Sequence, residues 1–333
     1  MVAFMDHLLR SRLKEIHFCG KIAIFEVAND CDFKEMKTMR KIFAIGLAVV
    51  AAVACRPSGG KDLKTETVNY EESAAHADLS IKVELPVPGQ GAAADRIRKA
   101  LVEVMDGQLS HIGSYEEERL FPDYEGDTDK TESLLAYYRD KALESIGRLS
   151  QEDYDERVAS IEENDGLTDG QRKEILAEMP GWEYDFSLLK DRETDRYVVF
   201  LSEDYVYLGG AHGGIIGRGG LTFDKKDGAL VEQFLDPACL DAIQPLLRKG
   251  LSQYFSDNDM EVTPEELDNI LFLETGIVPF PAWTPYPSED GLVFTYQQYE
   301  IAAYAAGMPS FTIPVDDLLP YLTPAAKVLV GLE

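Results

Sequence analysis

The sequence predicts an α+β fold with a mostly antiparallel sheet, packed helices and two subdomains, and two observations favour it. Apolar residues recur at a spacing of two in some stretches and at helical spacing in others. These strand-like and helix-like stretches do not alternate strictly, as they would in a parallel sheet built from strand–helix–strand units. Hydrophobic residues make up 45% of the 333 residues, which is enough for a sizeable core.

The N-terminal part is expected to direct export rather than to fold. Residues 36–54 hold basic residues followed by an uninterrupted apolar run, the pattern of a signal peptide. The run ends in Ala-Val-Ala before Cys55, which resembles the processing site of bacterial lipoproteins, so Cys55 is the expected lipidation site. The alternative is a plain signal peptide that ends near a cysteine by chance. Residues 1–35 precede this signal, and we interpret them as a gene-model extension without fold or function.

A tether and a first subdomain follow. Residues 55–77 are polar and rich in small residues, which is typical of a linker. Within the predicted N-terminal subdomain, 78–204, residues 79–85 alternate as a strand does and residues 92–109 have helical spacing. Residues 111–180 are helical and acidic, an insertion with no strand pattern.

The predicted C-terminal subdomain spans residues 205–333. Two hairpins are predicted around this boundary, one with its turn at DRETD (191–195) and one with its turn at DKKDG (224–228). The hairpins are followed by helices over residues 239–255 and 263–273. Two further strands are then expected, with a short helix after Pro314.

The charge of the chain restricts its partners. Without residues 1–54, which hold eight Lys/Arg and six Asp/Glu, the chain has 24 basic and 54 acidic residues. Nucleic acid is excluded as a partner because its binding requires a basic surface. The chain is expected to associate with a membrane only through its lipid anchor. A cationic protein would be attracted, although high net charge also serves solubility.

The glycine-rich segment, residues 207–220, has seven glycines in fourteen positions around His212. His212 has no sequence neighbour suited to nucleophilic catalysis and no set of metal ligands, so catalytic residues, metal and cofactors are all expected to be absent. The glycines suit a structural loop, and a contact with a partner is a second possibility for His212. The loop glycines meant here are Gly209, Gly210, Gly213 and Gly214.

The aromatic loop, PFPAWTPYP at residues 279–287, is a second candidate contact surface, through Trp283 and Tyr286. The alternative is that this loop covers the core. Tyr296, Tyr299 and Tyr304 suit a packed strand and turn, or a carbohydrate platform.

Three stretches together resemble a known family: YVYLGGAHGG (205–214), the LTFDKKDGALVEQFLD after the glycine-rich segment, and GLVFTYQQYEIAAYAAGMPSFTIPVDDL (291–318). Over about residues 78–325 the chain resembles the extracellular domain of RsiV-type anti-sigma factors, which is also the non-catalytic module of PdaC-type peptidoglycan deacetylases. RsiV-type domains bind lysozyme, so the resemblance implies an envelope binding or sensing module. It carries over no deacetylase activity and no individual contact residue.

These observations predict a non-enzymatic lipoprotein of the bacterial envelope, anchored through Cys55 on the outer-membrane or periplasmic side, with a cationic protein such as lysozyme as partner. A carbohydrate or peptidoglycan-fragment binder is the first alternative. A hydrolase with an unrecognised site is the second.

Overall fold

The computed structural model describes residues 62–112, 119–210, 214–258, 260, 262–273 and 275–331. The predicted leader 1–35, the signal 36–54 and Cys55 lie outside these ranges. The predicted fold class is confirmed, since the described residues form a five-stranded sheet, a three-stranded sheet and several helices. No helix in these ranges combines the length and the apolar character needed to cross a membrane.

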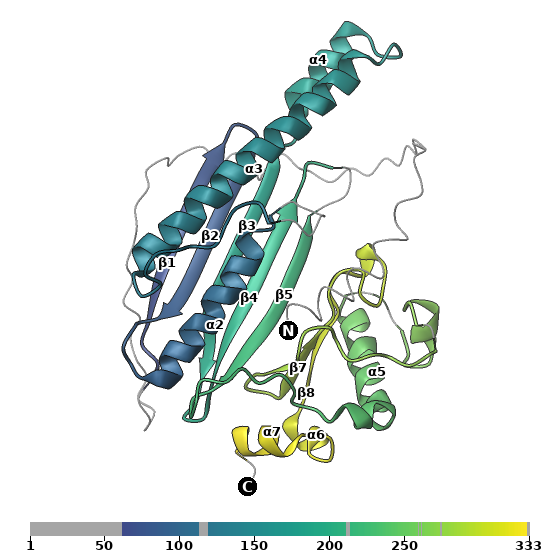
Figure 1. The fold of residues 1–333 in the computed structure, drawn as a ribbon. Coiled ribbons are helices and arrows are strands. Elements are labelled where there is room, and N and C mark those ends of the chain that lie inside the picture. The colour runs from purple at the N-terminus through teal and green to yellow at the C-terminus, as the bar shows by residue number, and fades with distance from the viewer. Residues whose placement is uncertain are drawn as a thin grey trace. The chain divides into compact units, whose positions relative to one another are not determined.

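The large sheet runs in chain order β1-β2-β3-β4-β5 (Figure 1). Its strands are β1 (Thr65–Ala74), β2 (Ala77–Pro86), β3 (Trp182–Glu193), β4 (Tyr197–Tyr207) and β5 (Ile215–Asp224). All neighbours are antiparallel except β2 and β3, which are parallel. A parallel pair needs a long crossover, and here it consists of α2 (Ala92–Leu109), α3 (Thr131–Glu162) and α4 (Asp169–Glu178).

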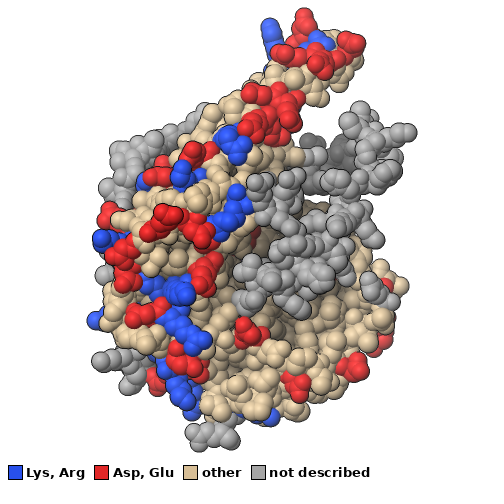
Figure 2. Space-filling view, viewed as in Figure 1, with Lys and Arg blue, Asp and Glu red and all other residues tan. Residues whose placement is uncertain are grey.

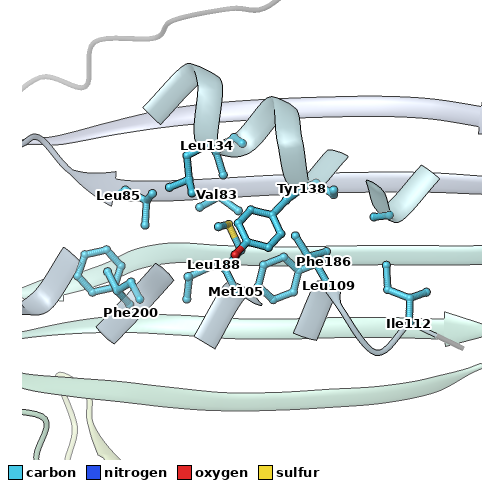
Figure 3. Packing of buried hydrophobic residues seen from close by; sticks show 14 of the residues in the cluster. Val83, Leu85, Met105, Leu109, Ile112, Leu134, Tyr138, Phe186, Leu188 and Phe200 are labelled. Atoms are coloured by element: carbon cyan, nitrogen blue, oxygen red, sulfur yellow. The ribbon is translucent and has the colours of Figure 1, made fainter. Parts of the chain in front are cut away.

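Helices α2 and α3 cover one face of this sheet (Figure 1). The α2 side chains Ile97, Leu101 and Met105 recur every four residues and are fully buried. They pack with Leu134 and Tyr138 of α3 and with alternate residues of β2, β3 and β4 (Figure 3). Such alternation is what a sheet with one helix-covered face requires.

Helix α3 is longer than the sheet needs. Its 32 residues correspond to about 48 Å at 1.5 Å per residue, so its C-terminal end runs past the strands with α4 beside it (Figure 1). Thr168 and Gln171 form a capping box that starts α4, and no α4 residue is buried. Residues 151–178 hold ten Asp/Glu and three Lys/Arg, and Figure 2 shows the acidic side chains gathered there.

A second cluster packs on the other face of β4, through Tyr197 and Val199. Residues 197–200 are therefore buried on both faces of the strand. The elements of this cluster are α5 (Leu240–Asp257), β6 (Tyr286–Pro287), β7 (Leu292–Thr295), β8 (Ser310–Ile313), α6 (Val315–Leu318) and α7 (Pro324–Leu329). The small sheet has the order β6-β7-β8 and is antiparallel.

Four expectations differ from this structure. The predicted linker 55–77 contains β1, which pairs with β2 along ten residues. The predicted boundary between residues 204 and 205 falls inside β4, because the sheet continues to β5. The second hairpin is reduced to one bridge, between Phe223 and Leu230. The predicted helix 263–273 is a single 3₁₀ turn at Glu266–Asn269.

Candidate contact surface

Two glycines of β5 make room for the aromatic loop. A Cβ on Gly219 would lie 1.6 Å from Cε3 of Trp283, and one on Gly220 would lie 2.2 Å from Cγ of Tyr286. Real atoms do not approach so closely, so only glycine allows both rings to reach the strand. Trp283 and Tyr286, predicted as partner contacts, are thus partly buried against β5. Burial also raises the pKa of Tyr286.

The loop glycines of the sequence prediction have different roles. Gly209 has φ +68°, a left-handed conformation that favours glycine. Gly210 is exposed, with open space where a Cβ would be. A Cβ on Gly214 would lie 2.0 Å from the ring of Tyr205. His212 and Gly213 lie outside the described residues.

Arg157 of α3 connects the start of the glycine-rich segment to the crossover helices through a hydrogen bond. Its Nη1 donates a hydrogen bond of 2.8 Å to the carbonyl of Gly209. Its Nη2 is paired with Asp153, whose carboxylate also accepts a 2.8 Å bond from Nε1 of Trp182. The segment is therefore anchored where it leaves β4.

The outer edge of β5 is closed by two glutamine side chains from the tyrosine turn, residues 297–304. The backbone N–H of Arg218 donates to Oε1 of Gln297 at 2.9 Å, and Nε2 of Gln297 donates back to the Arg218 carbonyl at 2.8 Å. The N–H of Ile216 donates to Oε1 of Gln298 at 2.8 Å. The amides thus replace a neighbouring strand at two positions of β5.

Glu300 connects the tyrosine turn to the aromatic loop. One carboxylate oxygen accepts from the N–H of Gln297 at 2.7 Å and the other accepts from the N–H of Ala282 at 2.7 Å. Both bonds have an ionised acceptor, which makes them stronger than neutral ones. The turn, the loop and β5 therefore form one hydrogen-bonded unit.

Among the described residues, Tyr299 is the one exposed aromatic side chain of this unit. It is 49% exposed and has φ +64°, the one positive φ outside glycine among the described residues. Its ring lies 5.7 Å from that of Tyr304, tilted by 39°, and the Tyr304 hydroxyl donates to the Gly214 carbonyl at 2.8 Å. Tyr296, in contrast, is fully buried, and its hydroxyl donates to the carbonyl of Pro279 at 2.8 Å.

Asp204 lies on the helix-covered face of β4, opposite Gly217. A Cβ on Gly217 would lie 2.4 Å from Oδ1 of Asp204, so the Asp204 carboxylate occupies the space that a side chain at residue 217 would need. Burial, followed by the charge of Glu203, raises the pKa of Asp204 to about 6. Ser202, on the same face, is 1% exposed, and its hydroxyl has no hydrogen-bond partner among the described residues.

The described residues contain no group of three or more His, Cys, Asp or Glu side chains that could hold a metal ion. Cys239 is a partly buried free thiol at the start of α5, and burial raises its pKa.

The described residues do offer a partly aromatic contact surface, made by Tyr299, Tyr304, Tyr205 and the start of β5. The sequence pointed to the aromatic loop and to the tyrosines, but it gave no sign that Tyr299 is the exposed one.

Comparison with known proteins identifies a related family and a shared fold. Residues 232–316 match the model of DUF3298, a family described as proteins of unknown function. A crystal structure of a DUF3298 family member from Bacteroides fragilis has a TM-score of 0.58 and 18% identity, over 80% of this chain and 96% of that one. A DUF3298 family protein from Pseudomonas aeruginosa has a TM-score of 0.48 and 15% identity, over 80% of this chain and 97% of that one.

No curated protein matches the chain. The DUF3298 match contains the aromatic loop and the tyrosine turn, whereas β5 precedes it. Residues 232–316 are thus similar to DUF3298, and the whole described chain has a fold that a DUF3298 protein also has.

Proposed function

We propose that this chain is a non-enzymatic binding or sensing module of the bacterial envelope, and that its partner contacts the tyrosine turn around Tyr299. The observation that carries the proposal is a half-exposed tyrosine held in left-handed backbone by its neighbours. That conformation costs a non-glycine residue about 1–2 kcal/mol. Such strain persists only where the surroundings impose it, and it is concentrated at binding and catalytic sites.

The surface around Tyr299 suits a protein partner. Tyrosine supplies a large contact area with few rotatable bonds, and it is enriched among the residues that dominate binding energy. The Gln297, Gln298 and Glu300 side chains fix the turn in advance, so little order would be lost on binding.

The chemistry of the partner follows from charge and from the family resemblance. The chain has 60 acidic and 32 basic residues, so a basic protein would be steered towards it. The RsiV-type resemblance names lysozyme as such a protein. The DUF3298 match at 232–316 covers most of the third resembling stretch, 291–318, and so supports the resemblance.

The test is titration of the purified chain with lysozyme at about 0.05 and 0.3 M salt, with an unrelated basic protein as control. Exposed charge pairs are screened over about 8 Å at 0.15 M, so a purely electrostatic attraction disappears at the higher salt. A site with an apolar centre retains one-to-one binding there. If lysozyme and the control protein both lose their binding at 0.3 M salt to the same extent, the lysozyme proposal is refuted.

Tyr299→Ala is expected to weaken that binding at least tenfold, since aromatic anchors contribute about 2 kcal/mol or more. Tyr299→Gly removes the same ring while relieving the positive φ, so it separates the ring from the backbone. Val328→Ala, which truncates a 61% exposed side chain on α7, is the matched control. Unchanged affinity in both Tyr299 variants would place the contact elsewhere.

A carbohydrate or peptidoglycan fragment is the second candidate, favoured by the exposed Tyr299 ring beside Tyr304. Aromatic rings present apolar faces that can stack on a sugar ring. Glycan binding would be insensitive to salt and would also depend on Tyr299. The same variants, titrated with soluble peptidoglycan fragments, therefore distinguish the two partners.

Anchoring through Cys55 is proposed from the sequence of residues 36–55. Mass spectrometry of the membrane-extracted protein is expected to find an acylated cysteine at position 55 as the first residue, with residues 1–54 removed. A mature chain that starts elsewhere, or one that retains residues 1–35, would contradict the lipoprotein proposal.

A further inference from the structure

The helical arm, residues 151–178, leaves the apolar side chains of its two helices unburied. It consists of the C-terminal part of α3, the turn that follows and α4, which run past the end of the large sheet (Figure 1). Val158 and Ile161 of α3 and Leu176 of α4 are only partly buried, and Ile175 is 41% exposed. An amphipathic helix is stabilised mainly by packing of its apolar face, so the arm lacks the packing that a third helix would supply.

The arm is nevertheless a defined hairpin. Arg172 of α4 donates through Nε to the carbonyl of Ile161 at 3.3 Å and through Nη2 to that of Asn164 at 2.6 Å, so it joins α4 to the end of α3. The capping box of Thr168 and Gln171 fixes the first turn of α4. The two helices are therefore held together before a partner arrives, which lowers the ordering cost of binding.

The arm carries more carboxylates than cations (Figure 2). Arg157 and Arg172 are each paired with an aspartate of the arm, and Lys173 is its third basic residue. Six acids of the arm are exposed and form no ion pair with any described residue: Glu156, Glu162, Glu163, Asp165, Glu174 and Glu178. The last two lie one helical turn apart on α4, and like charges at this spacing repel each other.

Charge complementarity decides what fits this surface. A second copy of the chain, with 60 acidic and 32 basic residues, would bring its own negative charge. Nucleic acid and anionic lipid are repelled for the same reason. A segment rich in Lys and Arg is attracted, and the apolar side chains of the arm require apolar residues on one face of that same segment.

We propose that the arm binds a cationic amphipathic helical peptide. The apolar face of the peptide covers Ile175 and the partly buried side chains of the arm, and its Lys and Arg residues pair with Glu174 and Glu178. Helix α4, with ten residues, is about 15 Å long, so a peptide of about 14 residues, or about 21 Å, covers it. The site consists of other residues than the tyrosine turn and does not depend on the proposed function.

The first experiment titrates the full chain, at about 0.15 M salt, with a synthetic peptide of about 14 residues in which Leu and Lys alternate at helical spacing. The control peptide has the same composition in an order that gives it no apolar face. The amphipathic peptide is expected to bind at least fivefold more tightly and to increase amide exchange protection in residues 151–178. Equal affinity of the two peptides, or unchanged protection in the arm, would overturn the proposal.

A pair of charge variants tests whether the carboxylates of α4 take part. Glu174→Gln/Glu178→Gln is expected to weaken binding of the amphipathic peptide about threefold to tenfold, which is the range for two exposed charge pairs. Glu232→Gln/Glu289→Gln removes two exposed acids outside the arm and is the matched control, expected to change the affinity less than twofold. If both double variants weaken binding equally, the attraction belongs to the net charge and the proposal fails.

An apolar variant tests the other half of the site. Ile175→Gln is expected to weaken binding about fivefold, because 41% of the side chain is exposed and available for burial. Glutamine is at least as good a helix former as isoleucine, so α4 should be retained. Val328→Gln, on α7, is the matched control and should bind as the wild type does. An unchanged affinity in Ile175→Gln would overturn the proposal, and the two peptides decide the outcome if this variant loses α4.

Two further measurements exclude other occupants and other sites. Tyr299→Ala should bind the peptide as the wild type does, and a loss in this variant would place the peptide on the tyrosine turn instead. Sedimentation equilibrium of the chain alone should give no dimer that depends on the arm. A dimer that Ile175→Gln dissociates would make a second copy the occupant and overturn the proposal.

Discussion

Gly219→Ala is expected to destabilise the fold by about 3 kcal/mol, the upper end of typical costs for overpacking. The new methyl group would lie 1.6 Å from Cε3 of Trp283, so either the ring or the strand must move. Denaturant unfolding monitored by circular dichroism measures the loss. Gly210→Ala is the matched control, because a Cβ there has open space and the change should cost less than about 1 kcal/mol.

The cause of that loss can be checked with a second substitution. In Gly219→Ala/Trp283→Ala the clash is absent, so the double variant should be more stable than the sum of the two single changes predicts. A coupling of about 1 kcal/mol or more is expected for groups in direct contact. Additive effects, or a Gly219→Ala variant as stable as the wild type, would show that the ring does not occupy this space.

Asp204→Asn is expected to stabilise the protein by about 2–3 kcal/mol at pH 7.5, since the pKa of Asp204 is about 6 in the fold against an ordinary 3.8. The folded pKa is raised, so the fold binds the proton more tightly than the unfolded chain does. Wild-type stability therefore falls as the pH rises from about 4 to 6. The gain from asparagine should shrink as the pH is lowered through this window.

Equilibrium unfolding at several pH values between 5 and 7.5 measures this gain. Glu203→Gln, beside it on the strand, is a comparison variant in which the gain from asparagine should be smaller, because the charge of Glu203 is the second cause that raises the pKa of Asp204. It removes a partly exposed ion pair with Arg218, an interaction that contributes at most about 1 kcal/mol. An Asp204→Asn variant that is less stable than the wild type at pH 7.5 would mean that the charge is compensated in the fold.

Much of the fold follows from local patterns. The helix predicted over 92–109 has the same bounds in the structure, because its buried positions recur at helical spacing. Strand β1 was missed because only one of its faces packs, and sparsely. Its pairing uses backbone groups, which any sequence carries, so ten mostly polar residues have the composition of a tether.

The site was less accessible to sequence reasoning, since it depends on contacts between distant residues. Sixty-four positions separate Gly219 from Trp283, and nothing in either stretch indicates that one needs the other. The partial burial of Asp204 results from its place within the sheet rather than from its neighbours in the chain. The left-handed backbone of Tyr299 is set by hydrogen bonds at Gln297, Gln298 and Glu300.

The amides of Gln297 and Gln298 on β5 have a consequence for self-association. A bare edge strand can accept a strand from another molecule, and the added strand presents a new edge, so growth can continue. A side-chain amide satisfies the same backbone groups but offers no extended backbone for the next addition. On β5 the ladder therefore stops at residues 216 and 218, and polymerisation through that part of the edge has no starting point.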